Sequence, residues 1–504
     1  MIRNNTTGPP VMRGTMQAAP VQGGRGIRQR KATLGLFQPL PAWAWIAAFV
    51  LTLASLTTIY PLLTAVCVLT LPVCASLLLF KGESPILFAC CGMQWLQVVV
   101  TVFYCDFYGV TMATVLEGPE VERATLLCVI GILALALGMR LALSTAGRGG
   151  EVAGVLEADA GRFDMARIFQ FWIFTSALGT IAEGVGWRVV SLHQFVVPFY
   201  NLKWVFFFML SYIVLLRDRG YGLLLIAMAV EFVTGFLGWF SSYKEGLIMF
   251  LIVAMTLRRS MNGRLRAGMI AVILLGSVTS VFWASIKADY RMYNSGGKEG
   301  THGLSRHTIT ERLNWLADRV SRMDEKTLDL GMRMLLARLQ YVALFGQTLS
   351  HVPRFEPHAN GELWLGAVKH VLMPRFIFRS KETLDDSERA RRFTGLRLSG
   401  GESGTSIGIG YMAESYADFG SVGMFVPVFL LGVLMARIYQ VALRNKHSAM
   451  LGTAIGTAML FAVLQAFATS NAKLVGSLVL LSLAYWAMNK VYGERVMRWL
   501  KVQQ

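Results

Sequence analysis

Lysine and arginine side chains recur at the ends of the apolar segments of this chain. Lys244 stands in the run SYKEG at 242–246, and Lys287 and Arg291 open and close the run KADYR at 287–291. Arginine holds phosphate oxygens in pairs and lysine adds a point charge. Cations with so few neutralising carboxylates suit a polyanionic group, and a pyrophosphate at the headgroup level of a membrane is the natural candidate.

A denser basic segment, MPRFIFRSK, occupies residues 373–381. It brings Arg375, Arg379 and Lys381 together beside aromatic residues. Such a segment suits a phosphate or the face of a sugar. The alternative is a basic turn that is merely solvated.

A second dense segment, GTSIGIGYMAESYADFG, occupies residues 404–420. Its small residues lead into a predicted helix that Thr405 or Ser406 would cap. Glu414 then falls within the first turns, near the membrane surface. A carboxylate there is placed to deprotonate a sugar hydroxyl. The alternative is that Glu414 only stabilises the helix N-terminus.

Long apolar runs must position these residues, because a membrane-spanning helix needs about 20 apolar residues. We find about twelve such runs by this criterion. They lie near residues 40–57, 60–80, 84–104, 122–144, 166–186, 198–216, 221–240, 244–257, 267–287, 421–442, 449–468 and 473–492.

The composition agrees with a membrane protein. The 504-residue chain is 54% hydrophobic and only 15% charged, whereas soluble proteins carry about 25% charged residues. Its mean hydropathy is +0.50. These values exclude a soluble enzyme, a disordered protein and a nucleic-acid-binding domain. The net charge of +18 is then best explained by basic residues kept on cytoplasmic loops, so we expect membrane lipid and no nucleic acid as partners.

Basic residues in the short loops set the orientation. With the basic N-terminal tail inside the cell, every such cluster falls on the same side, which predicts an even number of spans and cytoplasmic termini. The predicted organisation is a disordered basic cytoplasmic tail (1–37), spans one to nine (38–287), an outer loop domain (288–420), spans ten to twelve (421–492) and a basic cytoplasmic tail (493–504).

The outer loop domain is long enough to be functional rather than a connection. The sequence predicts a soluble helix over 308–320, an amphipathic helix over 332–352 and another over 362–378. Most of the histidines lie in this loop, and three of them are alternatives to Glu414 as a catalytic base: His351, His358 and His370.

Further charges lie at the predicted outer ends of spans, and each alone is explained by snorkelling or by an ion pair. Together they predict an outward-facing polar cavity. Glu231 differs because it lies in mid-helix, where it is either a hydrogen-bonded structural acid or part of a deeper polar path. The remaining charges of this kind are Glu183, Arg188, Lys203, Glu245 and Asp289.

These four motifs, SYKEG, KADYR, MPRFIFRSK and GTSIGIGYMAESYADFG, resemble the Wzy-type polymerases of O-antigen and exopolysaccharide. The order of spans, one large late loop and a few closing spans is also similar to that family. The resemblance implies an all-α polytopic protein of about 12 transmembrane helices in the bacterial inner membrane. One large, partly helical periplasmic loop would precede the last three spans.

The resemblance also implies a metal-independent inverting glycosyltransferase of the GT-C type, with no cofactor. It would move a growing glycan from undecaprenyl pyrophosphate onto a lipid-linked repeat unit. A chain-length regulator and a flippase are candidate partners. By position, Lys244, Lys287, Arg291, Arg375 and Arg379 would bind the pyrophosphate, Glu414 would be the base, and Tyr290 and Tyr411 would contact the sugar or acceptor.

Two other functions stay open. An O-antigen-ligase-like transferase would use the same donor with another acceptor. A transporter or flippase would place charges near the bilayer midplane and would use discontinuous helices, whereas most charges here lie at the outer edge.

Overall fold

The computed structural model describes residues 37–144, 151–188, 193–238, 242–257, 262–296, 307–373, 385–398, 406–464 and 466–501. Within these ranges the chain forms helices and no strand, apart from one isolated bridge between Phe163 and Lys501. The predicted all-α class is confirmed. Residues 1–36 of the predicted N-terminal tail, together with Arg375 and Arg379, lie outside the described residues.

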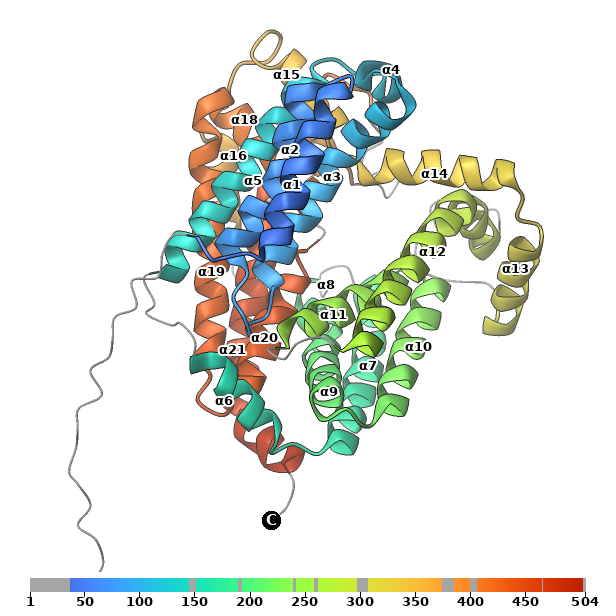
Figure 1. Ribbon diagram of the computed structural model, residues 1–504, viewed down its shortest axis with the longest axis vertical. Coiled ribbons are helices and arrows are strands. Elements are labelled where there is room, and N and C mark those ends of the chain that lie inside the picture. The colour runs from blue at the N-terminus through green and yellow to red at the C-terminus, as the bar shows by residue number, and fades with distance from the viewer. Residues whose placement is uncertain are drawn as a thin grey trace, which may run out of the picture. The chain divides into compact units, whose positions relative to one another are not determined.

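The helices follow the apolar runs of the sequence (Figure 1). The first twelve are α1 Ala42–Ala54, α2 Pro61–Leu78, α3 Ile86–Tyr108, α4 Met112–Leu116, α5 Val121–Ser144, α6 Glu151–Ala160, α7 Met165–Arg188, α8 His193–Asn201, α9 Lys203–Arg217, α10 Tyr221–Leu237, α11 Tyr243–Thr256 and α12 Gly263–Ser295. The others are α13 Ile309–Ser321, α14 Glu325–Leu339, α15 Val342–His351, α16 Glu362–Leu372, α17 Asp386–Thr394, α18 Gly410–Gly423, α19 Phe425–Leu443, α20 Ala449–Phe461 and α21 Asn471–Leu500. Short 3-10 turns, Ser55–Thr57 and Ala466–Ala468, follow α1 and precede α21.

Eight segments of the described chain are long and apolar enough to cross a membrane: α2, α3, α5, α7, the run Val196–Arg217, α12, α19 and α21. The four remaining predicted runs correspond to the shorter helices α1, α10, α11 and α20, of 13 to 17 residues. A span needs about 20 residues. The structure is therefore that of a multi-pass helical membrane protein.

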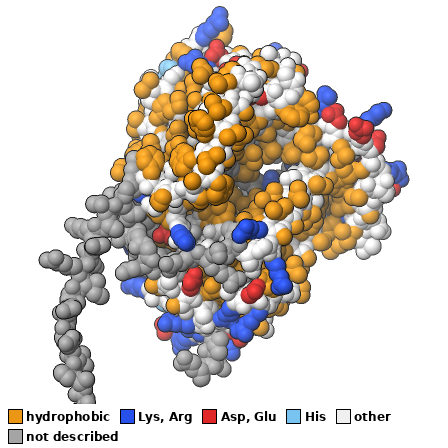
Figure 2. All heavy atoms as spheres, in the orientation of Figure 1, with side chains coloured by type: hydrophobic (Ala, Val, Ile, Leu, Met, Phe, Trp, Pro, Cys, Tyr) orange, Lys and Arg blue, Asp and Glu red, His pale blue; other side chains and the backbone are white. Residues whose placement is uncertain are grey.

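The outward faces of these helices are apolar. Trp43, Leu62, Leu225 and Leu274 are among the large hydrophobic side chains that are more than half exposed. Figure 2 shows hydrophobic side chains over much of the face, which is hollowed between α1–α3 and α12, and charged side chains mainly on its lower part and along its edges. Such broad apolar surface is stable only against lipid.

Small residues set the closest helix contact, between α5 and α19. A Cβ atom at Gly138 would lie 2.1 Å from the Phe429 carbonyl oxygen, and one at Gly432 would lie 2.1 Å from that of Leu135. Only glycine allows this reciprocal approach of two backbones. The contact fixes α19, and thereby α18 before it, against the N-terminal helices.

The outer segment differs in part from the prediction. Thr308 forms a capping box with Glu311 at the start of α13, as the predicted helix over 308–320 requires. The single helix predicted over 332–352 is instead two helices, α14 and α15. The break falls at Tyr341, whose N–H donates to Gln97 O and whose hydroxyl donates to Ile409 O. Tertiary hydrogen bonds outweigh the local helical pattern there.

Two further details depart from the sequence reading. The residue before α18 is Ile409, and no side chain caps that helix. The Ser406 hydroxyl accepts from Lys473 Nζ at 2.8 Å instead, while Thr405 lies outside the described residues. The chain kinks at Gly420, with φ 70° and ψ −172°, before α19 begins.

Candidate functional site

Four cations come from α12 and from the two helices that pack on it, α11 and α14, and we call them the cation cluster: Lys244, Lys287, Arg291 and Arg338. The charged groups that act on the Lys287 ammonium are Arg291, Arg338 and Lys244. Arg338 also acts on Arg291. The structure thus brings together three of the five cations predicted to bind pyrophosphate, and the other two lie outside the described residues.

Local geometry explains how the cation cluster forms. Lys287 and Arg291 lie one turn apart on α12 and so share a face. On α14, a Cβ at Gly331 would lie 2.5 Å from Val281 O of α12, so that glycine lets the two helices touch. Arg338 follows Gly331 by two turns and therefore points from the same face of α14. Lys244 comes from the first turn of α11, which packs on α12.

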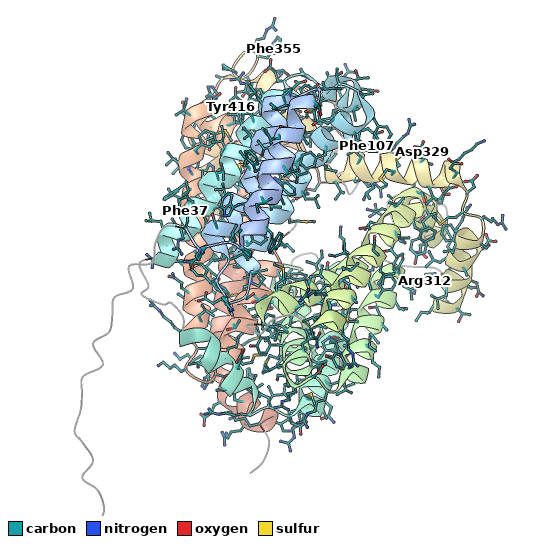
Figure 3. All side chains as sticks on the ribbon, viewed as in Figure 1. Phe37, Phe107, Arg312, Asp329, Phe355 and Tyr416 are labelled. Atoms are coloured by element: carbon teal, nitrogen blue, oxygen red, sulfur yellow. The ribbon has the colours of Figure 1, made fainter. Side chains whose placement is uncertain are left out.

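The nearby acids point elsewhere. Asp289, within KADYR, pairs with Arg319 of α13 at 3.6 Å. Arg312 of α13 donates to Leu237 O at the end of α10 at 2.8 Å, which holds α13 beside α10 (Figure 3). Among the groups that act on Lys287, no carboxylate appears within the described ranges. Glu245 acts on Lys244, whereas the charges that act on Lys287 are all positive, so the surroundings of Lys287 suit a polyanion.

Sequence reasoning missed Arg338. The run around it, MRMLLARL, has the period of an amphipathic surface helix and carries no motif. Only the crossing of α14, which packs on both α12 and α3 (Figure 1), brings Arg338 to the other cations.

A second charged group lies inside the helices α7 to α11, and we call it the ion-pair group. Lys203 Nζ donates to Glu231 Oε2 at 2.6 Å, and both side chains are buried. The ammonium also lies 4.7 Å from the centre of the Trp204 ring. Glu231 is thus buried and hydrogen-bonded, as the first of the two predicted alternatives requires. The charges that act on nearby Glu245 are Lys203, Glu231, Lys244 and Glu183.

Glu414 lies in a third, separate place, where α17, α18 and the start of α21 meet. Its side chain is 1% exposed, and its Oε2 accepts from the Asn471 N–H at 2.8 Å. Burial raises the pKa of Glu414 to about 8 against the opposing effects of that hydrogen bond and of Arg389, and Asp386 and Asp418 raise it further. The carboxyl is thus poised to exchange a proton near neutral pH.

The same three elements hold a set of polar side chains around Glu414. Lys473 Nζ pairs with Asp386 Oδ2 at 2.7 Å. A Cβ at Gly408 would lie 3.5 Å from Ser470 N and 3.6 Å from Asp386 Oδ2, so the start of α21 and the start of α17 face each other across this glycine. We call Asp386, Arg389, Ser470, Asn471 and Lys473, with Glu414, the polar site.

One short segment connects the two places. Arg338 lies in the last turn of α14, and Tyr341 follows three residues later. The Tyr341 hydroxyl accepts from the Ala413 N–H at 3.2 Å, one residue before Glu414. The side chain of Tyr341 is buried, and Glu414 acts on its hydroxyl electrostatically. Tyr341 thus joins the end of α14 to the backbone beside Glu414.

The other predicted residues are engaged in packing. Tyr290 and Tyr411 are fully buried, and their hydroxyls donate to Leu237 O and Gln94 Oε1. A direct contact of either with a sugar would require these bonds to break. Asp418 accepts from the N–H groups of Leu363 and Trp364 and so caps α16.

The loop histidines lie apart from one another. His358 Nδ1 lies 3.3 Å from Ala417 O of α18, and the His351 ring stacks on Phe355. His370 has a partner within the structure. In the described chain, Glu414 forms no hydrogen bond with any of the three. Within the same ranges, no three His, Cys, Asp or Glu side chains converge as metal ligands would.

The fold and these clusters define a multi-pass helical membrane protein with a cationic site and a buried acidic site. Residues 151–483 match the model of a family described as a domain of unknown function (DUF8712), and the chain belongs to that family. The match contains both the cation cluster and the polar site. Comparisons with curated proteins and with solved structures found no match.

Proposed function

We propose that this protein is a polysaccharide polymerase of the Wzy type. It transfers a growing glycan from undecaprenyl pyrophosphate to a lipid-linked repeat unit, as a metal-independent inverting glycosyltransferase. The observation that supports this most is the cation cluster, in which Arg291, Arg338 and Lys244 surround Lys287. A lipid diphosphate brings negative charge to the place where three cations act on Lys287.

The donor pyrophosphate is already a good leaving group, so the protein has little covalent chemistry to perform. The acceptor hydroxyl oxygen attacks the anomeric carbon and forms the glycosidic bond. The bond from that carbon to the pyrophosphate oxygen breaks, and its electron pair leaves with undecaprenyl pyrophosphate. The hydroxyl proton passes to the Glu414 carboxylate. The cation cluster stabilises the charge that develops on the leaving diphosphate.

The proposed topology has twelve spans, the eight long segments plus α1, α10, α11 and α20, with both termini cytoplasmic. The helices α13 to α17 then lie in the periplasm of a bacterial cell, outside its inner membrane. Two features support this arrangement: the basic residues of the short loops fall on one side, and the hollow seen in Figure 2 opens between apolar faces, where a polyprenyl chain can enter from the bilayer.

The direct test is the lipid-linked glycan profile of a deletion strain. Accumulated single repeats support a polymerase. Long chains that stay on the carrier indicate an O-antigen-ligase-like enzyme instead, and repeats trapped on the inner leaflet indicate a flippase. Complementation by Arg291→Ala should leave single repeats, whereas Arg333→Ala should restore polymer, because Arg333 pairs with Asp329 on an exposed part of α14 (Figure 3).

A further inference from the structure

The polar site holds an unusual concentration of buried polar atoms without a protein partner. Asp386 Oδ1, Arg389 Nη1, Ser470 Oγ and both side-chain amide atoms of Asn471 are buried, and in the described chain none of them forms a hydrogen bond. Ser470 and Asn471 are 0% exposed. Burying such an atom without a hydrogen bond is unfavourable, so five of them at one junction favour a partner that the protein itself does not supply.

The hydrogen-bond donors and acceptors among these atoms indicate what kind of ligand would bind them. Arg389 offers a donor, Asp386 offers an acceptor, and the Asn471 amide and the Ser470 hydroxyl offer both. Three acids (Asp386, Glu414 and Asp418) disfavour an anion here, and the cations Arg389 and Lys473 disfavour a metal ion. A neutral ligand with several adjacent hydroxyl groups, each of which donates and accepts, satisfies the set.

We propose that the polar site binds the acceptor sugar, with Arg389, Ser470 and Asn471 holding its hydroxyls beside Glu414. This inference rests on the proposed function and adds the place and the residues for the second substrate. Donor and acceptor then contact different residues: the cation cluster of α11, α12 and α14 binds the diphosphate, and the junction of α17, α18 and α21 binds the acceptor sugar. The two sets of residues must border one reaction centre, because the acceptor hydroxyl attacks the carbon that carries the diphosphate.

Lys473 forms the rim of this site. Its side chain is 40% exposed, unlike that of Asp386, which is 4% exposed, and its ammonium bonds Asp386 and Ser406. We therefore place the solvent-facing edge of the proposed sugar site at Lys473. The Asn471 side chain is free to bind because only its backbone N–H holds Glu414.

Two substitutions separate a binding role from a structural one. Ser470→Ala removes a hydroxyl that caps nothing, since α21 has no side-chain cap bond. Asn471→Leu removes two unpaired buried atoms and keeps the backbone N–H that bonds Glu414. Replacing such atoms by apolar ones is neutral or stabilising for the fold, so both proteins should unfold at the same temperature as the wild type or higher. Ser482→Ala is the matched control, because that hydroxyl on α21 only bonds Leu478 O.

The experiment measures binding of two probes to the full chain in detergent, by titration calorimetry. One probe is the free repeat-unit oligosaccharide, released by mild acid from the host's lipid-linked repeats, and the other is undecaprenyl pyrophosphate. We expect Ser470→Ala to bind the oligosaccharide about fivefold more weakly and Asn471→Leu at least about tenfold more weakly. Their affinity for undecaprenyl pyrophosphate should equal that of the wild type, and Ser482→Ala should bind both probes normally.

Oligosaccharide binding that is unchanged in both variants overturns the inference. If wild-type protein in proteoliposomes still elongates glycan in that case, the proposed function stands and only the acceptor site is wrong. If the wild type neither elongates glycan nor binds either probe, the proposed function fails and the inference fails with it.

Discussion

Two groups of charged residues lie on neighbouring helices, and they are built in opposite ways. In the ion-pair group, Lys203 and Glu231 are buried and paired at 2.6 Å. In the cation cluster, Lys287 is only partly buried and its charged neighbours are all cations. A charge in an apolar helix is costly in both cases. The first group offsets that cost by pairing within the protein, whereas the charges that act on Lys287 all repel it, so the first group should govern stability and the second activity.

The largest effect should come from breaking the ion pair. Glu231→Gln leaves the Lys203 ammonium buried without its counter-charge, which costs about 3–5 kcal/mol of stability. We expect a strong loss of folded protein, measured as the monodisperse fraction in detergent. The double variant with Lys203→Met and Glu231→Met should recover most of it, because it removes both charges. Full abundance of Glu231→Gln would show that the pair is not structural.

Substitutions in the cation cluster should lower activity and leave the stability of the protein unchanged. Arg291→Ala should lower kcat/KM for the lipid diphosphate donor about 100-fold while abundance and unfolding temperature stay normal. Arg291→Lys should recover part of the loss, because it restores the charge but not the paired hydrogen bonds. Normal donor kinetics in Arg291→Ala would show that the cation cluster does not govern activity.

Glu414 extends the comparison to a third charged residue, which is buried like Glu231 but lacks a bonded cation. The carboxyl must be ionised to accept a proton, and its pKa is raised to about 8. Below that pH the ionised fraction falls about tenfold per unit, so kcat should rise from pH 6 to pH 8 and then level off. An unshifted glutamate, with a pKa near 4.3, would give a flat profile over this range.

Two variants check that assignment. Glu414→Gln should lower kcat at least about 100-fold with little change in donor binding. Arg389→Lys retains the cation that favours ionised Glu414, so it should keep the same midpoint. Full activity of Glu414→Gln would exclude it as the base and direct attention to His351, His358 and His370.

Hydropathy was sufficient to predict the helices because it is a local property. Each of the twelve predicted runs coincides with a helix, although four are shorter than a usual span. Lys244, Lys287 and Arg291 were predictable because a charge stands out in an apolar run. The break at Tyr341 was not, because it depends on bonds to Gln97 and Ile409 from distant parts of the chain.

The polar site was only partly predictable, for the same reason. Glu414 stands out as an acid at the start of a helix. Ser470 and Asn471, by contrast, look like an ordinary helix start. Their position becomes informative only in the fold, where Gly408 lies between the starts of α17 and α21. A sequence pattern does not show which buried atoms will lack a hydrogen-bond partner.

The smallest effect should come from Arg338, the exposed member of the cation cluster. Solvent screens an exposed charge, so Arg338→Ala should raise the donor KM only about threefold to fivefold and should leave kcat nearly unchanged. The effect should shrink as salt is raised, whereas that of Arg291→Ala should persist because Arg291 is more deeply placed on α12. Arg333→Ala on the same helix should have no effect at any salt concentration. A kcat loss in Arg338→Ala would mean instead that α14 acts through Tyr341 on the backbone beside Glu414, and the cation cluster and the polar site would then have to be treated as one coupled unit.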